Sequence, residues 1–296
     1  MQPNYFIVGA PKCGTTTLAY WLSQTPSVFM TTPKEPHFYA PDYRQPAASI
    51  QCNDREQYDA LFDEVTDQHK AVGEASTHYL WSEVAISSIL ADAPDAKFVV
   101  CLRKPSDMVR SMHEHHLFWA LDNIPNLEKA WRLNEVRRTG RKNPPWNPNP
   151  AKLDYAKACA VGSQLDRLYR LVPEEQILIV LLEDMSQKPQ EVYRQVVEFI
   201  GGEPADIDFS RRNVTRRRRS NRVHAMVRGF RHFGKGRVPW RIIDLVHRIN
   251  ESRNTTSSRR ASQMTDEFRA ELVKFFIPEV EKIEVLIGRD LSHWKN

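Results

Sequence analysis

The chain has 296 residues, of which 41% are hydrophobic and 27% charged, and these proportions are ordinary for a soluble globular protein. No stretch approaches 18 uninterrupted apolar residues, and the N-terminal Met-Gln-Pro-Asn lacks the basic and apolar regions of a signal peptide. The four cysteines are scattered without a C-x-x-C pair, which favours free thiols over a disulfide framework or a zinc site. We therefore expect a cytoplasmic protein without integral membrane association.

The formal net charge of +5 is unevenly distributed. Residues 211–260 contain sixteen Arg and Lys against two acids, a local balance of +14, so that the rest of the chain carries −9. A basic segment joined to a mildly acidic body predicts an anionic ligand for that segment, and does not favour a general nucleic-acid-coating protein.

The first element in the chain is an apolar run, Tyr5–Val8, which is short enough to be a buried strand and stops at Gly9. A loop of small residues containing Lys12 follows, then Gly14, three threonines and apolar residues at helical spacing. A strand that leads through a glycine turn into a helix N-terminus forms an anion site, because free N–H groups and the helix dipole point to one place.

Strands alternate with helices along the rest of the chain. This order predicts an α/β protein with a P-loop-like, three-layer fold: a central, mainly parallel β-sheet flanked by helices, with ligands at the carboxyl ends of the strands. We expect one domain over 1–296, with a Pro-rich loop at 139–154 and the basic segment 211–260 inserted before the C-terminal helix. The expected strands are 28–30, from 71, 97–102 and 176–182; the expected helices are 54–62, 82–90, 106–120, 127–138, 155–171, 191–200, around 223–230 and 241–249, and from 265, where Pro278 predicts a kink or a break.

The stretch Thr31–Tyr39 has prolines on both sides of Lys34 and Glu35. A residue before proline is restricted to extended geometry. We therefore expect an extended segment in which Glu35 and His37, two residues apart, lie on the same side.

Gly9 and Gly14 have the glycine spacing of a Walker P-loop, but Thr15 stands where that motif requires lysine, and the lysine is instead Lys12. A magnesium-dependent nucleotidase would also need an acid at the end of a nearby buried strand. Here the strand 97–102 is followed by Arg103, which predicts an anion site without a metal.

These motifs resemble those of sulfotransferases that use 3′-phosphoadenosine 5′-phosphosulfate (PAPS). Pro11-Lys-Cys-Gly-Thr-Thr16 is similar to the family's 5′-phosphosulfate loop, and the segment 99–111, with Arg103 and Ser111, resembles its 3′-phosphate motif. Lys34-Glu-Pro-His-Phe-Tyr39 resembles a stretch of the heparan sulfate sulfotransferase branch and its bacterial relatives. Glu74-Ala-Ser-Thr-His-Tyr79 is similar to another motif of that branch, with Ala75 where the branch has lysine.

The resemblance implies that PAPS is the sulfuryl donor, that 3′-phosphoadenosine 5′-phosphate (PAP) is the product, and that no metal is needed. Glu35 would be the general base, with His37 beside it as orienter or substrate contact, and Lys12 would stabilise the leaving phosphate. The 5′-phosphosulfate would be held by Lys12, Cys13, Gly14, Thr15, Thr16 and Thr17. Arg103 and Ser111 would hold the 3′-phosphate, and Lys235, Gly236 and Arg237 resemble a further basic contact to it.

The acceptor is open: a hydroxyl or amine of a glycan, a lipid or a small molecule. Ala75 removes the acceptor contacts expected of heparan-type enzymes. His113 and His116 share a helix face, but no acid or cysteine stands at ligand spacing, so no metal site is predicted. Two alternatives are a P-loop-type small-molecule kinase and a non-catalytic nucleic-acid binder that uses the basic segment. The sequence does not set the oligomeric state.

Overall fold

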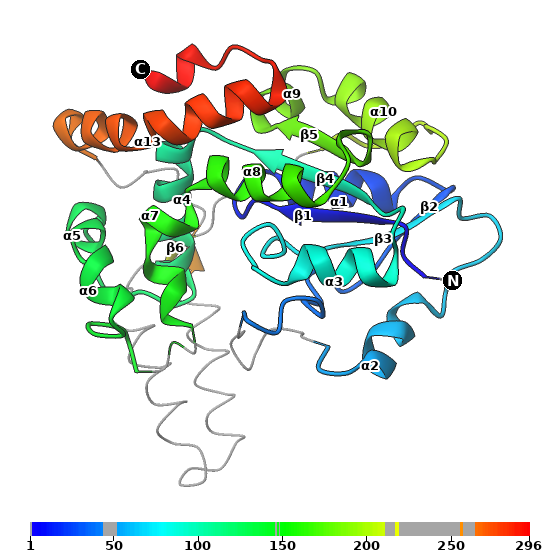
Figure 1. Cartoon of the computed structure of the whole chain (residues 1–296), viewed down its shortest axis with the longest axis horizontal. Coiled ribbons are helices and arrows are strands. Elements are labelled where there is room, and N and C mark those ends of the chain that lie inside the picture. The colour runs from blue at the N-terminus through cyan, green and yellow to red at the C-terminus, as the bar shows by residue number, and fades with distance from the viewer. Residues whose placement is uncertain are drawn as a thin grey trace, which may run out of the picture. The chain divides into compact units, whose positions relative to one another are not determined.

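A five-stranded parallel sheet forms the centre of the fold (Figure 1). The computed structural model describes residues 2–43, 52–145, 147, 149–210, 217–218, 255–256 and 264–296. The strands run in the order β2-β3-β1-β4-β5. Their bounds are β1 Tyr5–Gly9, β2 Val28–Met30, β3 Ala71–Ala75, β4 Lys97–Leu102 and β5 Ile177–Leu181.

The inner strands are apolar because both of their faces are covered. All five residues of β1 and of β3 are buried, and so are five of the six residues of β4. Continuous apolar runs of this kind are typical of parallel sheets that carry helices on both faces. The chain leaves β1 towards β2 on one side of the sheet and later returns across it to β4, so the carboxyl ends of β1 and β4 adjoin the point where the strand order reverses.

Helices cover both faces of this sheet. Helix α1 packs against α10, and α3 packs against α8, which lies in front of the sheet in Figure 1. The helix bounds are α1 Thr15–Ser23, α2 Arg55–Asp59, α3 Ala85–Asp92, α4 Pro105–Phe118, α5 Leu127–Arg132, α6 Asn134–Arg138, α7 Tyr155–Ala158, α8 Val161–Leu171, α9 Leu182–Gln187, α10 Pro189–Ile200 and α13 Asp266–Ile287, with 3-10 turns η1 Ala60–Phe62, η2 Pro150–Leu153, η3 Glu174–Gln176 and η4 Ser292–Lys295.

The chain divides into two units. The first comprises Met1–Met108, Ala160–Asn213 and Val273–Asn296 and contains the sheet. The second comprises Val109–Cys159 and Val214–Leu272 and includes α5, α6, α7 and the short antiparallel pair β6 Arg217–Arg218 and β7 Thr255–Thr256.

The second unit is held by a fully buried ion pair. Nη1 and Nη2 of Arg137 donate to Asp122, at 2.8 and 2.7 Å, and the Tyr155 hydroxyl donates to the same carboxylate at 2.8 Å. Removing one partner of such a pair leaves a buried charge uncompensated, which typically costs about 3–5 kcal/mol. His113 and His116 bond elsewhere in this unit, to the Ile124 carbonyl at 2.8 Å and to the Tyr155 hydroxyl at 3.3 Å.

The predicted fold class is confirmed: the sheet is entirely parallel and flanked by helices. The expected strands 28–30 and 97–102 match β2 and β4 residue for residue. Of the kink or break predicted at Pro278, the kink stays a prediction and the break is wrong, because α13 continues through this proline. Its stripe of buried side chains, Phe268, Leu272, Phe276, Val280 and Ile283, explains this: each contributes about 1.5–3 kcal/mol, more in total than the roughly 3 kcal/mol that an interior proline costs. Among the described residues, no helix combines the length and apolarity needed to cross a membrane.

Candidate active site

The segments that follow four neighbouring strands supply the candidate residues of the first unit. Lys12 follows β1, Lys34 and Glu35 follow β2, the segment 76–79 follows β3, and Arg103 follows β4 directly. Since carboxyl ends of parallel strands share one edge of a sheet, these segments meet there. Backbone contacts link them: the Glu35 N–H donates to the Ala75 carbonyl at 3.0 Å.

The loop after β1 presents the open N-terminus of α1. Lys12 has a φ of 66° and Gly14 a φ of 95°, both in the left-handed region. Gly14 precedes the helix without a side-chain cap, and the first turn of α1 carries no acid. The φ of Gly14 is one that L side chains rarely adopt, so the turn requires glycine for its conformation, and a Cβ there would also displace the end of the Leu182 side chain, 2.8 Å away. A helix N-terminus without a side-chain cap or an acid favours a bound anion, because of its backbone N–H groups and the helix dipole.

The hydroxyls and the thiol of this loop differ in what they can offer an anion. Thr16 and Thr17 are partly exposed, whereas Thr15 is 4% exposed and accepts a hydrogen bond from the Lys34 ammonium at 3.4 Å. The Cys13 thiol is fully buried and donates to the Pro11 carbonyl at 3.4 Å. Burial raises the pKa of that thiol to about 12, so it stays protonated; because it is buried and donates inward, the backbone of Cys13 is the part that can face an anion.

Charged groups of both signs act on the partly buried Lys12. Burial lowers the pKa of its ammonium, and the charges of Arg103 and Lys34 act in the same direction, while Glu35 opposes them. A cation whose charged form is disfavoured in this way gains stability when an anion binds beside it. The electrostatics of the loop therefore favour a bound phosphate or sulfate.

Glu35 is surrounded by donors on both of its oxygens. The Lys34 ammonium lies 2.7 Å from Oε1, the Thr77 hydroxyl donates to the same oxygen at 3.3 Å, and His37 Nε2 lies 3.4 Å from Oε2. Burial alone would raise the pKa of Glu35, but the Lys34 charge and the His37 hydrogen bond outweigh it and hold that pKa well below its usual range. The carboxylate is therefore ionised at neutral pH, and its side chain remains 38% exposed, within reach of a ligand.

The segment containing Glu35 is not extended as predicted. Glu35 and His37 have φ values of 70° and 51°, left-handed conformations that are rare for residues other than glycine. Their side chains do meet, but through these two turns of the backbone and not through the alternation of an extended chain. Left-handed conformations of this kind occur preferentially at functional sites, and Lys12, Glu35 and His37 all have them.

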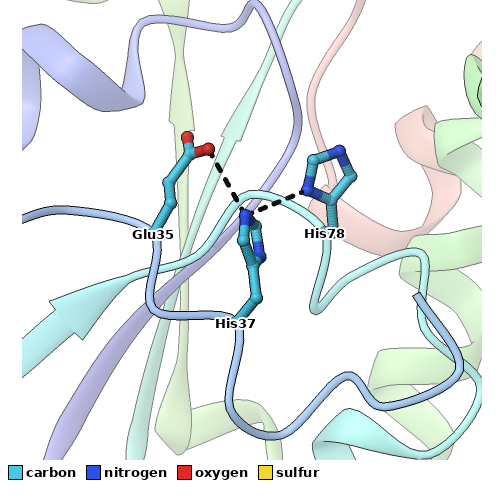
Figure 2. A group of neighbouring side chains, drawn as sticks. All are labelled: Glu35, His37 and His78. Atoms are coloured by element: carbon cyan, nitrogen blue, oxygen red, sulfur yellow. Dashed lines mark hydrogen bonds and ion pairs between the residues drawn. The ribbon is translucent and has the colours of Figure 1, made fainter. Parts of the chain in front are cut away.

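His78, from the segment after β3, completes a row of three side chains. Figure 2 shows the His37 ring between Glu35 and His78, with Nε2 of His37 3.4 Å from Glu35 Oε2 and 3.4 Å from His78 Nδ1. His37 is 1% exposed, whereas His78 is partly exposed and stacks on Tyr43, with ring centroids 3.9 Å apart. The carboxylate thus contacts the His37 imidazole, which in turn contacts the His78 imidazole.

The same three side chains bring one potential ligand atom each within 4.8 Å of one another. However, the Lys34 ammonium already lies 2.7 Å from the carboxylate, and Lys12 is close enough to interact with it. A divalent cation here would share its only anionic partner in the row with these lysines. The arrangement fits proton handling better than metal binding.

Glu74, on β3, has a contrasting environment. Its carboxylate is fully buried and accepts hydrogen bonds from the hydroxyls of Ser76 and Tyr79, each at 2.6 Å, and of Tyr58, at 3.2 Å. Burial raises the pKa of Glu74 to about 7, even though these hydroxyl bonds act in the opposite direction. Ser76 and Tyr79 belong to the turn after β3, so their hydrogen bonds to Glu74 fix that turn to the strand.

Arg167 of α8 holds the next part of this turn. Its Nη2 donates to the backbone carbonyls of Leu80, Trp81 and Ser82, at 2.6, 3.0 and 3.0 Å. Three carbonyls that would otherwise lack a helical or strand partner thus converge on one cation.

The remaining predicted donor contacts fall in different parts of the molecule. Arg103 belongs to the first unit and Ser111, on α4, to the second, so that their joint contact to one phosphate stays a prediction. Lys235, Gly236 and Arg237 lie outside the described residues. The sequence prediction missed Lys34 and His78, although both stand inside the quoted motifs 34–39 and 74–79.

Comparison with known proteins agrees with the motifs. A family model described as "Sulfotransferase domain" matches residues 2–277. A crystal structure of a sulfotransferase from Alicyclobacillus acidocaldarius superimposes with a TM-score of 0.72 and 26% identity, over 100% of both chains.

Two curated relatives are more distant. The membrane-associated sulfotransferase kil1 of Dictyostelium discoideum is 26% identical over 44% of this chain and 26% of its own length. The bifunctional heparan sulfate N-deacetylase/N-sulfotransferase 3 of Mus musculus is 25% identical over 68% of this chain and 22% of its own length. The chain thus spans less than half the length of these relatives. From the match over most of its length, the chain belongs to the sulfotransferase family.

Proposed function

We propose that this chain transfers a sulfuryl group from PAPS to a hydroxyl or amine of a carbohydrate, lipid or small-molecule acceptor. One observation supports this most directly: the Lys34 ammonium contacts both Thr15, in the anion-binding loop, and Glu35, the candidate base. The chain belongs to the sulfotransferase family, and direct transfer of a group requires the donor site and the base to lie close together.

The residues of the loop suit the donor's 5′-phosphosulfate. The uncapped N-terminus of α1, the Lys12 ammonium and the hydroxyls of Thr15, Thr16 and Thr17 supply donors without a competing acid in the first helical turn. We assign the 3′-phosphate to Arg103 and Ser111, with Lys235, Gly236 and Arg237 as a further contact. Cationic side chains in the loop can neutralise the leaving phosphate, so the proposed reaction needs no metal.

The transfer itself requires one base. When PAPS is bound, its sulfur is the electrophile of the reaction. Glu35 accepts the proton of the acceptor hydroxyl, the acceptor oxygen bonds to sulfur, and the bond between sulfur and the 5′-phosphate oxygen breaks. Lys12 faces that phosphate oxygen as its charge increases, and His37 orients the carboxylate. General base catalysis of this kind contributes typically about 10²–10⁴-fold.

The acceptor class is proposed from the relatives. One is named for heparan sulfate and another, from Mus musculus, is named carbohydrate sulfotransferase 15, which supports a glycan acceptor for this chain. Ala75 stands where heparan-type enzymes have lysine, so a different glycan, a lipid or a small molecule is equally compatible. None of the four cysteines forms a disulfide, which supports our proposal of a reducing, cytoplasmic location.

Calorimetric titration with PAP tests this function. We expect tight binding that is unchanged by EDTA, and a loss of about 10- to 100-fold in affinity for Lys12→Met, because a charge-assisted contact is removed. Lys70→Met is the matched control, since Lys70 forms a surface ion pair with Glu203 away from the loop. Tighter binding of ATP with Mg²⁺ than of PAP would support the kinase alternative instead. Transfer of label from radiolabelled PAPS to extract components, followed by mass spectrometry, then identifies the acceptor.

The nucleic-acid alternative makes different predictions. A binder that uses the basic segment 211–260 would lose affinity steeply with salt, and Lys12→Met would leave that binding unchanged. Among the described residues, no contact of the site at the carboxyl ends of the strands favours this alternative.

A further inference from the structure

Lys34 occupies a position between the donor loop and the base. Its ammonium lies 2.7 Å from Glu35 Oε1 and 3.4 Å from the Thr15 hydroxyl, and its side chain is 19% exposed. Its charge also acts on Lys12. One flexible cation thus lies within hydrogen-bond distance of a carboxylate on one side and of the predicted phosphosulfate position on the other.

We propose that Lys34 couples donor binding to the basicity of Glu35, an inference that rests on the proposed function. Its ammonium holds the Glu35 carboxylate before the donor binds and turns to the donor's phosphosulfate afterwards. Lys34 is then a second cation on the donor's 5′-phosphate, which the product PAP also carries, in addition to Lys12. It also keeps the carboxylate ionised and in place until the donor arrives.

Charge balance explains the direction of this movement. In the donor-free protein, Lys34 and Arg103 both act on Lys12, Glu35 compensates for Lys12 and Lys34, and the Lys34 charge also acts on the buried Glu74. The 5′-phosphosulfate brings further negative charge to the loop beside Thr15. An ammonium that contacts Thr15 already can reach this anion by a side-chain rotation, without a change in the backbone.

The consequence concerns the strength of the base. The groups that act on Glu35 are Lys12, Lys34, His37, His78 and Tyr43. Among them, the Lys34 charge is the largest influence that lowers the Glu35 pKa. When Lys34 turns away, this pKa rises, so that Glu35 becomes a stronger base at the moment when sulfuryl transfer can occur. An acceptor that binds without the donor meets a weaker base.

The test measures Glu35 directly, by ¹³C NMR of protein labelled at glutamate side-chain carboxyls, with Glu35→Gln to assign the signal. In the absence of any nucleotide, we expect a higher Glu35 pKa in Lys34→Gln than in wild type, because the ammonium is gone. Saturating PAP should raise the Glu35 pKa in wild type. In Lys34→Gln, PAP should raise the Glu35 pKa by less than half as much. Lys34→Arg should retain most of the wild-type response, and Lys70→Gln all of it.

Activity gives a second measurement. We expect Lys34→Gln to lower kcat/KM for PAPS by about 10- to 100-fold, the effect of one lost charge-assisted contact. We also expect the acidic limb of its pH profile to move upwards, a change that a purely structural role would not produce. Circular dichroism checks that the variant is folded.

The outcomes separate the two proposals. If wild type does not bind PAP, the proposed function and the coupling both fail. If wild type binds PAP while the Glu35 pKa stays constant, or changes equally in wild type and Lys34→Gln, the coupling alone is wrong. An unchanged Glu35 pKa in nucleotide-free Lys34→Gln would also overturn it.

Discussion

Glu35 and Glu74 lie on neighbouring segments of one sheet edge, yet their environments act in opposite directions. Burial alone would raise both pKa values. At Glu35, a lysine and two histidines reverse this effect, while at Glu74 three hydroxyls reduce it without reversing it, and the pKa rises to about 7. Burial is the largest single influence at both acids, but at Glu35 the nearby charges and hydrogen bonds together outweigh it, and at Glu74 they do not. Accordingly, the partly exposed Glu35 is suited to catalysis, and the buried Glu74 is suited to stabilising the turn after β3.

The largest expected effect comes from removing the charge of Glu35. Glu35→Gln keeps the shape of the side chain but cannot accept the acceptor's proton, so we expect kcat to fall by about 10²–10⁴-fold. PAP affinity, measured by calorimetry, should stay near that of wild type because the loop around Lys12 is unchanged. If activity is retained, Glu35 is not the base, and His37 is the first residue to examine.

Glu74→Gln tests the other half of the comparison through stability. Because the folded-state pKa of Glu74 is raised from 4.5 to about 7, protonation favours the folded state. This contribution is fully present below pH 4.5 and is lost as the pH rises to 7, a change of about 3 kcal/mol at most.

The measurement is urea unfolding at several pH values between 4.5 and 8. We expect the free energy of unfolding of Glu74→Gln to decline less with rising pH than that of wild type. Parallel pH dependences for the two proteins would mean that Glu74 titrates normally and that its hydroxyl partners fully compensate for its burial.

The smallest expected effect concerns His78, which touches Glu35 only through His37. His78→Gln should lower kcat by about 3- to 10-fold with KM unchanged, as expected for one neutral hydrogen bond. The acidic limb of the pH profile should move slightly upwards, because the His78 charge contributes to lowering the Glu35 pKa. Activity that depends on added Zn²⁺ and is lost in EDTA would instead indicate metal binding by the row.

The parts of the fold that could be predicted are those with a local signal. Continuous apolar runs located β2 and β4, and the glycine before the three threonines located the start of α1. The uninterrupted helix α13 could not be predicted from Pro278, because the stripe of buried side chains that outweighs the proline depends on tertiary packing.

The sequence motifs of the candidate site could be predicted, but its backbone conformations and side-chain contacts could not. Glu35 and His37 have left-handed conformations that prolines on either side do not suggest. Lys34 and His78 join the site through contacts with Thr15 and His37, residues 19 and 41 positions away in the chain. Such contacts depend on which strand ends adjoin, and the strand order β2-β3-β1-β4-β5 is a property of the whole sheet.

The three carbonyl contacts of Arg167 have a consequence for protein engineering. Helix α8 begins 59 residues after the end of β4. Through one guanidinium nitrogen of Arg167, it fixes the end of the turn that carries His78. Random mutagenesis for a new acceptor range should therefore find α8 sensitive at this one arginine, although it touches no proposed ligand. An alanine there would leave the three carbonyls without this partner. Libraries that fix Arg167 while varying the surface around it should keep more active members.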